Sequence, residues 1–180
     1  MSATNMTKRE SITPDREHAT DTRPQKVTTF LWFNDNAEEA VNFYVSVFKN
    51  SRIISSARYG KTGPGPEGSI MIIDFELEGV RYTALNGGPH FKLSEAVSLV
   101  VHCQTQEEVD YYWEKLSEGG EKVECGWVKD KFGLSWQITP EVLLELIQNS
   151  DQEKLDRVMS AMMQMKKLDI KGIEDAAKQK

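Results

Sequence analysis

Thr29-Phe30-Leu31-Trp32-Phe33 and Ser98-Leu99-Val100-Val101-His102 are two short apolar runs, 69 positions apart in a chain of 180 residues. A helix start follows each run, Asn36-Ala37-Glu38-Glu39 in the first case and Thr105-Gln106-Glu107-Glu108 in the second. Both starts predict a capping box, in which the Asn or Thr side chain accepts from the third helical N–H and the Glu reaches back. The chain is therefore predicted to hold one module twice, with two sheets pairing around a cleft.

The first module is predicted to continue as a β-α-β-β unit. Its expected elements are strands over 27–33, 52–59, 70–77 and 81–86, and a helix over 37–49. Within the third of these strands, Ile73 and Phe75 alternate with Asp74 and Glu76, which places the acidic side chains on the opposite face. The Gly- and Pro-rich segment 61–68 is predicted to be a mobile loop.

The second module is predicted to repeat this order more briefly, with strands over 97–103, 122–129 and 134–139 and a helix over 107–118. Residues 141–180 are predicted to form a helical extension, with a capping box beginning at Ser150. In this extension the apolar positions follow three- and four-residue steps, which predicts a stripe that packs on the protein's own sheet or on a second subunit. The stripe comprises Leu155, Val158, Met162, Met165 and Leu168.

Composition excludes several classes of protein. The net charge of −6 argues against a nucleic-acid surface, which needs concentrated Lys and Arg. No apolar run approaches the roughly 20 residues of a membrane span, and the N-terminus has no apolar signal-peptide core. Two cysteines in a chain of this length indicate a reducing compartment, so we expect a cytoplasmic protein. Residues 1–26 are polar and without periodicity, and they are predicted to be a disordered tail.

Several motifs resemble the PhnB-like family. They are the stretch from Cys125 to Ile138, Phe30-Leu31-Trp32-Phe33 with Ala37-Glu38-Glu39-Ala40, Ala84-Leu85-Asn86-Gly87-Gly88-Pro89, and Arg157-Val158-Met159 with Ala161-Met162-Met163. This family belongs to the vicinal oxygen chelate superfamily of glyoxalases, bleomycin-resistance proteins and extradiol dioxygenases, and its members often carry the label 3-demethylubiquinone-9 3-methyltransferase.

The resemblance implies an α+β fold of paired βαβββ modules, the glyoxalase/bleomycin resistance/dioxygenase-like fold, followed by C-terminal helices. The glyoxalase-type domain would then cover residues 27–140, with modules at about 27–88 and 96–140, and residues 141–180 would be the extension. The resemblance also implies a homodimer.

The resemblance further implies where a metal would bind. Metal-dependent members of the superfamily carry His, Glu or Gln on four strands that face the cleft, and these positions correspond to Thr28, Asn86, Ser98 and Gln137. A catalytic divalent site needs His, Cys or carboxylate ligands at high density. We therefore expect no metal cofactor, and a cleft whose hydrogen-bonding groups take a small organic ligand.

Other cleft candidates follow from strand alternation. His102 lies two steps along from Ser98 and is either a general base or an ordinary strand histidine. Phe30 and Trp32 share a face with Thr28, and Trp127 shares one with Cys125, so these side chains either wall an apolar cleft or belong to the core.

Cys125 is either a thiolate or a packing residue, and Trp136 is expected to face the helices.

The functional hypotheses are thus a metal-independent small-molecule-binding protein, an enzyme, or a structural dimer without a ligand. The enzyme alternatives are a metal-dependent glyoxalase- or dioxygenase-type reaction and methyl transfer. The turn Asn34-Asp35-Asn36 after the first strand has no glycine, whereas methyltransferases that use S-adenosylmethionine have a Gly-rich turn there.

Overall fold

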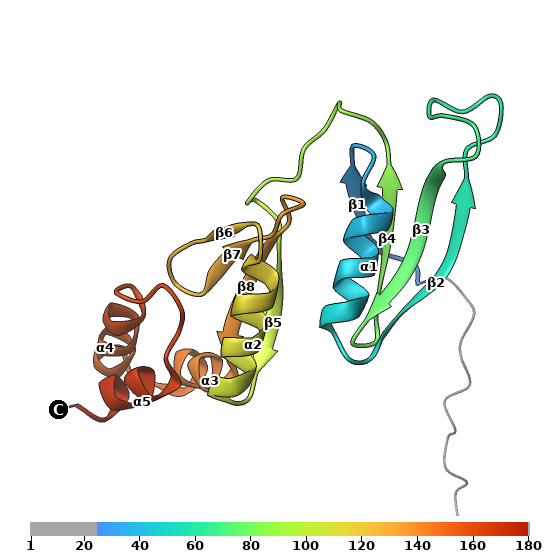
Figure 1. Ribbon diagram of the computed structural model, residues 1–180. Coiled ribbons are helices and arrows are strands. Elements are labelled where there is room, and N and C mark those ends of the chain that lie inside the picture. Colours follow the sequence, from blue (N-terminus) through green and yellow to red (C-terminus); the bar gives the residue numbers. More distant parts are fainter. Residues whose placement is uncertain (1–24, 180) are drawn as a thin grey trace, which may run out of the picture.

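Two modules with the same order of elements form the body of the protein (Figure 1). The computed structural model describes residues 25–179, so most of the predicted tail at 1–26 lies outside the described residues. The first module comprises β1 (Thr29–Phe33), α1 (Ala37–Val47), β2 (Ser51–Arg58), β3 (Ile70–Leu77) and β4 (Val80–Asn86). The second comprises β5 (Ser98–Cys103), α2 (Gln106–Ser117), β6 (Glu121–Lys122), β7 (Trp127–Lys129) and β8 (Ser135–Pro140).

Three helices follow the second module, α3 (Glu141–Asn149), α4 (Gln152–Met162) and α5 (Ile170–Lys178). None of the helices between residues 25 and 179 is long and apolar enough to cross a bilayer.

The two sheets have equivalent topologies, β1-β4-β3-β2 and β5-β8-β7-β6. In each sheet the first strand pairs in parallel with the fourth, and the remaining pairs are antiparallel. The predicted repeat and the predicted α+β class are therefore confirmed.

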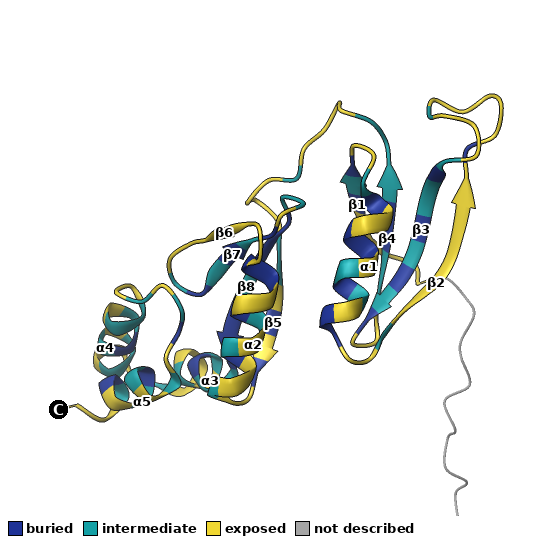
Figure 2. Ribbon diagram, viewed as in Figure 1, coloured by how far each residue is buried: buried dark blue, intermediate teal, exposed yellow. Residues whose placement is uncertain are grey.

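One face of each sheet is covered by the helix of its own module, because apolar residues alternate along the strands (Figure 2). In the first module Leu31, Ile73 and Phe75 are buried under α1, and in the second Val128 and Ile138 lie in the same core cluster as α2. The opposite side of each sheet, called here its open face, carries the intervening side chains.

The prediction of one continuous strand over 122–129 is wrong, because a turn separates β6 from β7. Cys125 has φ 57° and Gly126 has φ 80°, and two successive left-handed residues interrupt a regular strand. Their backbone N–H groups donate to the carbonyls of Met165 and Lys166, at 2.8 and 2.7 Å. The chain that follows α4 thus holds this turn in place.

Segment 61–68, predicted to be a mobile loop, lies against the ring of Tyr59. A side chain at Gly63 or Gly65 would collide with that ring, so both glycines are required for the close approach. The Tyr59 hydroxyl in turn donates to the Asn86 carbonyl at 2.6 Å, which ties the loop to the end of β4.

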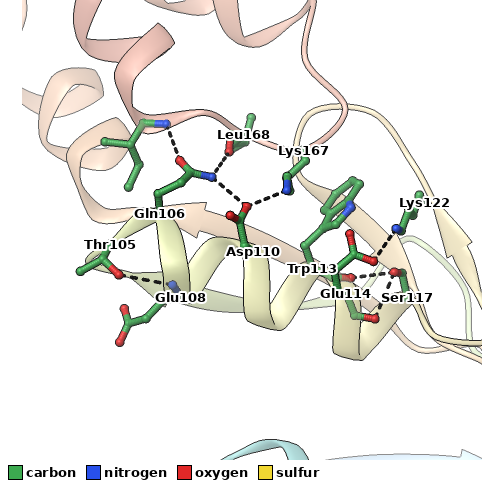
Figure 3. A network of polar contacts seen from close by, with 11 residues as sticks. Thr105, Gln106, Glu108, Asp110, Trp113, Glu114, Ser117, Lys122, Lys167 and Leu168 are labelled. Carbon is green, nitrogen blue, oxygen red and sulfur yellow. Dashed lines mark hydrogen bonds and ion pairs between the residues drawn. The ribbon is translucent and has the colours of Figure 1, made fainter.

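The three C-terminal helices have a small core of their own and dock on α2. Met162 and Met165 of the predicted stripe pack against buried Val158 and Leu168, together with Leu143 of α3 and Ile173 of α5. Figure 3 shows how Gln106 of α2 joins the two parts, because its amide donates to the Leu168 carbonyl at 3.1 Å and accepts from the Ile170 N–H at 2.9 Å. The stripe therefore packs on neighbouring helices rather than on a sheet.

Helices α2 and α4 begin with a side-chain cap, as the sequence predicts, whereas the expected cap of α1, Asn36, makes no such hydrogen bond. Thr105 accepts from the Glu108 N–H at 3.3 Å, and the Glu108 carboxylate accepts from the Gln104 N–H at 2.7 Å. At α4 the cap is Asp151, which accepts from the Lys154 N–H, so the predicted start at Ser150 is displaced by one residue.

The carboxylate of Asp130 joins the two modules. It is 3% exposed and accepts from the Tyr44 hydroxyl of α1 at 2.9 Å and from the Trp136 indole of β8 at 2.8 Å. The backbone N–H groups of Phe132 and Leu134 donate to its other oxygen. Burial raises the pKa of the Asp130 carboxyl, and the four hydrogen bonds oppose this effect.

Replacing Asp130 with Asn is expected to lower the free energy of unfolding by about 2–4 kcal/mol, measured by urea denaturation. The amide places an NH₂ group against donors, so at least one buried donor loses its acceptor. Asp35→Asn, at an exposed position, is the matched control and should change stability by less than about 0.5 kcal/mol. Equal effects of the two substitutions would contradict the role assigned to Asp130.

Candidate functional site

The open face of the first sheet is organised in three rows that run across its strands. Trp32, Leu85 and Ile72 are register neighbours and form an apolar row. Phe30, Thr83, Asp74 and Ser55 form the next row, and Arg81, Glu76 and Arg52 form a charged row. Because register neighbours point to the same side of a sheet, this face changes from apolar to charged along the strands.

Aromatic side chains dominate one end of this face. Phe30 is 55% and Phe91 is 66% exposed, and the Phe91 ring meets Trp32 edge-on with centroids 4.9 Å apart. The Trp32 indole donates to the Gly88 carbonyl at 2.9 Å. The predicted positions Phe30 and Trp32 are therefore on the open face, with Trp32 fixed in its orientation.

A cavity of about 250 Å³ lies beside the second row, lined among others by Thr28, Ser55, Asp74 and Thr83. The Asp74 carboxylate accepts from the Thr83 hydroxyl at 2.7 Å and from the Ser55 hydroxyl at 2.9 Å. Thr28 is thus the third predicted position on this side of the first sheet. Asp74 was not among the predicted site residues, although its alternation with Ile73 and Phe75 already placed it on the face away from the core.

The open face of the second sheet carries three further predicted residues. The Gln137 amide donates to the Ser98 hydroxyl at 2.8 Å, and Trp127 is the register neighbour of Gln137 on β7. His102 lies on the same face, opposite Thr139. Within residues 25–179, the His102 side chain forms no hydrogen bond or ion pair, so no neighbouring group orients its ring as a general base requires.

Two predicted site residues do not lie on an open face. The Asn86 side chain points to the helix side, where its Oδ1 accepts from the Ala37 N–H at 2.8 Å and its Nδ2 donates to the Ile70 carbonyl at 3.0 Å. It caps α1, and Asn36, the expected cap, makes no such bond. Cys125 lies in the left-handed turn with its sulfur 3.7 Å from that of Met163, toward the C-terminal helices.

A second cavity, of about 790 Å³, lies where the two modules meet. Its walls include Tyr82 of β4, His102 of β5, and Tyr111 and Tyr112 of α2. Burial raises the pKa of the Tyr82 and Tyr112 hydroxyls, so both remain protonated donors at neutral pH. Of the predicted site residues, only His102 reaches this larger cavity, so the predicted cleft and this cavity do not coincide within one chain.

The donor set does not fit a resident divalent metal. Among residues 25–179, no three His, Cys, Asp or Glu side chains come together as a metal site. Thr28 and the hydrogen-bonded pair Ser98–Gln137 offer neutral oxygen and nitrogen atoms from two different sheets. Burial and the nearby Glu108 and Glu141 carboxylates raise the pKa of Cys103 to about 12, which keeps this thiol protonated and unsuited to metal binding or nucleophilic attack.

The arrangement of the modules defines a glyoxalase-type fold, and comparison with known proteins supports this class. The chain is similar to a solved PhnB protein from Bacillus cereus, described as a putative 3-demethylubiquinone-9 3-methyltransferase, with 40% identity and a TM-score of 0.59. The match covers 64% of this chain and 99% of the other. A protein from Pseudomonas aeruginosa shares the fold at 19% identity and a TM-score of 0.54, covering 65% of this chain and 98% of the other.

Residues 25–139 match the family described as 3-demethylubiquinone-9 3-methyltransferase, and the chain belongs to this PhnB-like family of the vicinal oxygen chelate superfamily. A fosfomycin resistance protein from Listeria monocytogenes, solved with Mn(II) and sulfate, is similar at 16% identity and a TM-score of 0.41, over 61% of this chain and 84% of the other. No curated protein matches the chain.

The methyl-transfer label finds no structural counterpart in the turn between β1 and α1. A doubly wound methyltransferase places a Gly-rich turn there for close approach of its cofactor. Here the turn contains no glycine, and the adjoining N-terminus of α1 is occupied by the Asn86 side chain. Sheets of mixed direction with one covered face also differ from the parallel sheet of that fold.

Replacing Asn86 with Ala is expected to lower the free energy of unfolding by about 1–2 kcal/mol, because the Ala37 N–H loses its acceptor. Asn36→Ala is the matched control, and it should cost less than about 0.5 kcal/mol since its side chain caps nothing. Thermal and urea unfolding of both variants measures the difference. The reverse order of the two effects would restore Asn36 as the cap.

Proposed function

We propose that this PhnB-like protein binds a small organic ligand on the open faces of its sheets, without a metal ion, and acts as a homodimer. The observation that carries this proposal is the chemistry of the open faces. Their positions hold uncharged hydrogen-bonding groups such as Ser98 and Gln137, beside the exposed or half-exposed aromatic rings of Phe30, Trp32 and Trp127. Ligand sites combine apolar and aromatic surface with a few placed polar groups in this way.

The residues at the four positions expected to hold a metal favour binding without one, because none of them is a strong ligand. Ser98 and Gln137 satisfy each other by a hydrogen bond, and the residue of β4 on the open face near the expected Asn86 is Leu85. Leucine offers no donor atom to a metal. A metal-dependent isomerase or dioxygenase would therefore have to obtain its ligands from elsewhere.

Metal analysis tests this part of the proposal. Protein purified without an affinity tag is expected to contain far less than one metal ion per chain. Its melting temperature should not rise with micromolar Ni, Zn, Mn or Fe(II), because only an ion that binds the native state stabilises it by mass action. Protein dialysed against a chelator is the control. Near-stoichiometric metal, or a shift of several degrees that the chelator reverses, would contradict the proposal.

The second copy is proposed because one chain leaves its cleft residues on separate surfaces. The modules contact each other through Tyr44 of α1 and Phe48, which follows α1, with Trp136 of β8, all on the helix sides of the sheets. Both β1 and β5 are edge strands. Val97, just before β5, is 62% exposed, and Val100 within β5 is 44% exposed. An apolar edge strand is a template for pairing with another chain. A partner's first sheet opposite this second sheet would complete a two-sided cleft.

Light scattering after size exclusion is expected to give twice the chain mass of 20.5 kDa. Val100→Lys should shift the protein toward the single-chain mass, because a charged side chain on an edge strand opposes pairing. Val123→Lys is the matched control, since Val123 is 43% exposed but lies outside the edge strand. A monomeric wild-type chain would contradict the dimer, and equal effects of both variants would contradict the assigned edge.

A further inference from the structure

The open face of the first sheet has an uneven distribution of charge between its two rows with a carboxylate. Glu76, two residues along β3, lies 3.2 Å from the Arg52 guanidinium and 3.9 Å from that of Arg81. Asp74, by contrast, forms no ion pair within residues 25–179, and its carboxylate accepts from the hydroxyls of Thr83 and Ser55. One carboxylate on this open face is thus matched by cations, and the other is held by neutral groups.

We propose that Asp74 is the specificity-determining residue of the ligand site and that the ligand is an organic cation, a primary amine or amidine attached to a flat apolar body. This inference rests on the proposed function, since it concerns the same open face. A carboxylate has about four lone-pair sites, and the hydroxyls of Thr83 and Ser55 occupy two. Arg81 also lines the adjoining cavity, but Glu76 offsets its charge at 3.9 Å, so the remaining sites of Asp74 are available to a donor there.

The cavity beside Asp74 has the size of a polar head group rather than that of a whole ligand. Its volume of about 250 Å³ lies below the roughly 300–1,000 Å³ of complete small-molecule sites. The ammonium or amidinium group would lie there and donate to Asp74. A charge-assisted bond of this kind is about twice as strong as one between neutral groups.

The flat body of the ligand would lie on the neighbouring aromatic surface. Phe30, Thr83 and Asp74 are successive register neighbours on β1, β4 and β3. Two strand spacings of about 4.8 Å place Phe30 roughly 10 Å from Asp74 along this row. The adjacent row of Trp32, Leu85 and Ile72 continues the apolar surface, so one molecule can contact rings and carboxylate together.

Isothermal titration of the full chain with 2-naphthylmethylamine and with 2-naphthylmethanol tests this inference, because the two probes share a ring system and differ in charge. Wild-type protein is expected to bind the amine at least about tenfold more tightly than the alcohol. Asp74→Asn should remove this preference by lowering the affinity for the amine, and an unchanged midpoint of urea denaturation would show that the variant is folded. Glu76→Gln is the matched control and should retain the preference.

Three results would overturn parts of this assignment in distinguishable ways. Equal affinity of wild-type protein for both probes would overturn the cationic ligand and leave the proposed small-molecule site intact. A preference that survives Asp74→Asn would overturn the role of Asp74. Saturable binding of neither probe would overturn the proposed binding surface itself, and with it this inference.

Discussion

The buried carboxylate of Asp130 is the constraint on which the arrangement of the two modules depends. Its oxygens accept from a side chain of the first module, Tyr44, and from a side chain and backbone of the second. An ionised group at 3% exposure is tolerable only when its lone pairs are matched, and four donors provide this match. Burial and the charge of Asp130 raise the pKa of Tyr44 well above its usual range, so this phenol remains a donor. The modules are consequently held together by a directional polar cluster inside an aromatic core.

This connection decides which surfaces remain available. Tyr44 and Trp136 both project from the helix-covered sides, and Phe48 stacks on Trp136 and Tyr112 there. The edges of β1 and β5 therefore remain unpaired within the described residues. Contacts between the helix-covered sides do not bring the two open faces together into one cleft. In the homodimer proposed above, the second molecule completes the cleft, and each chain supplies one open face to it.

Sequence patterns predicted the repeat, the order of strands and helices, and the burial of Trp136, because alternation and helical spacing are local properties. They failed where distant residues decide the outcome. Asn86 was expected in the cleft, and Asn36 was expected to cap α1, but a residue 49 positions later in the chain supplies the cap. Cys125 was expected on a strand, but bonds to Met165 and Lys166 hold it in a turn. No local pattern records such long-range hydrogen bonds. For Asp74, alternation along the strand predicted which face of the sheet its side chain lies on. It did not predict the hydrogen bonds from the hydroxyls of Thr83 and Ser55.

The position of Asn86 also explains the character of the site, since a shift of one residue along a strand reverses the face of a side chain. With Asn86 turned toward α1, its neighbour Leu85 lies on the open face between Trp32 and Ile72. A polar or metal-ligating residue at this position would interrupt the apolar row. Leucine instead makes the row continuous, so that uncharged surface extends up to the row of Thr83 and Asp74. The same hydrogen bond that stabilises the start of α1 therefore fixes the boundary between the apolar and polar parts of the site.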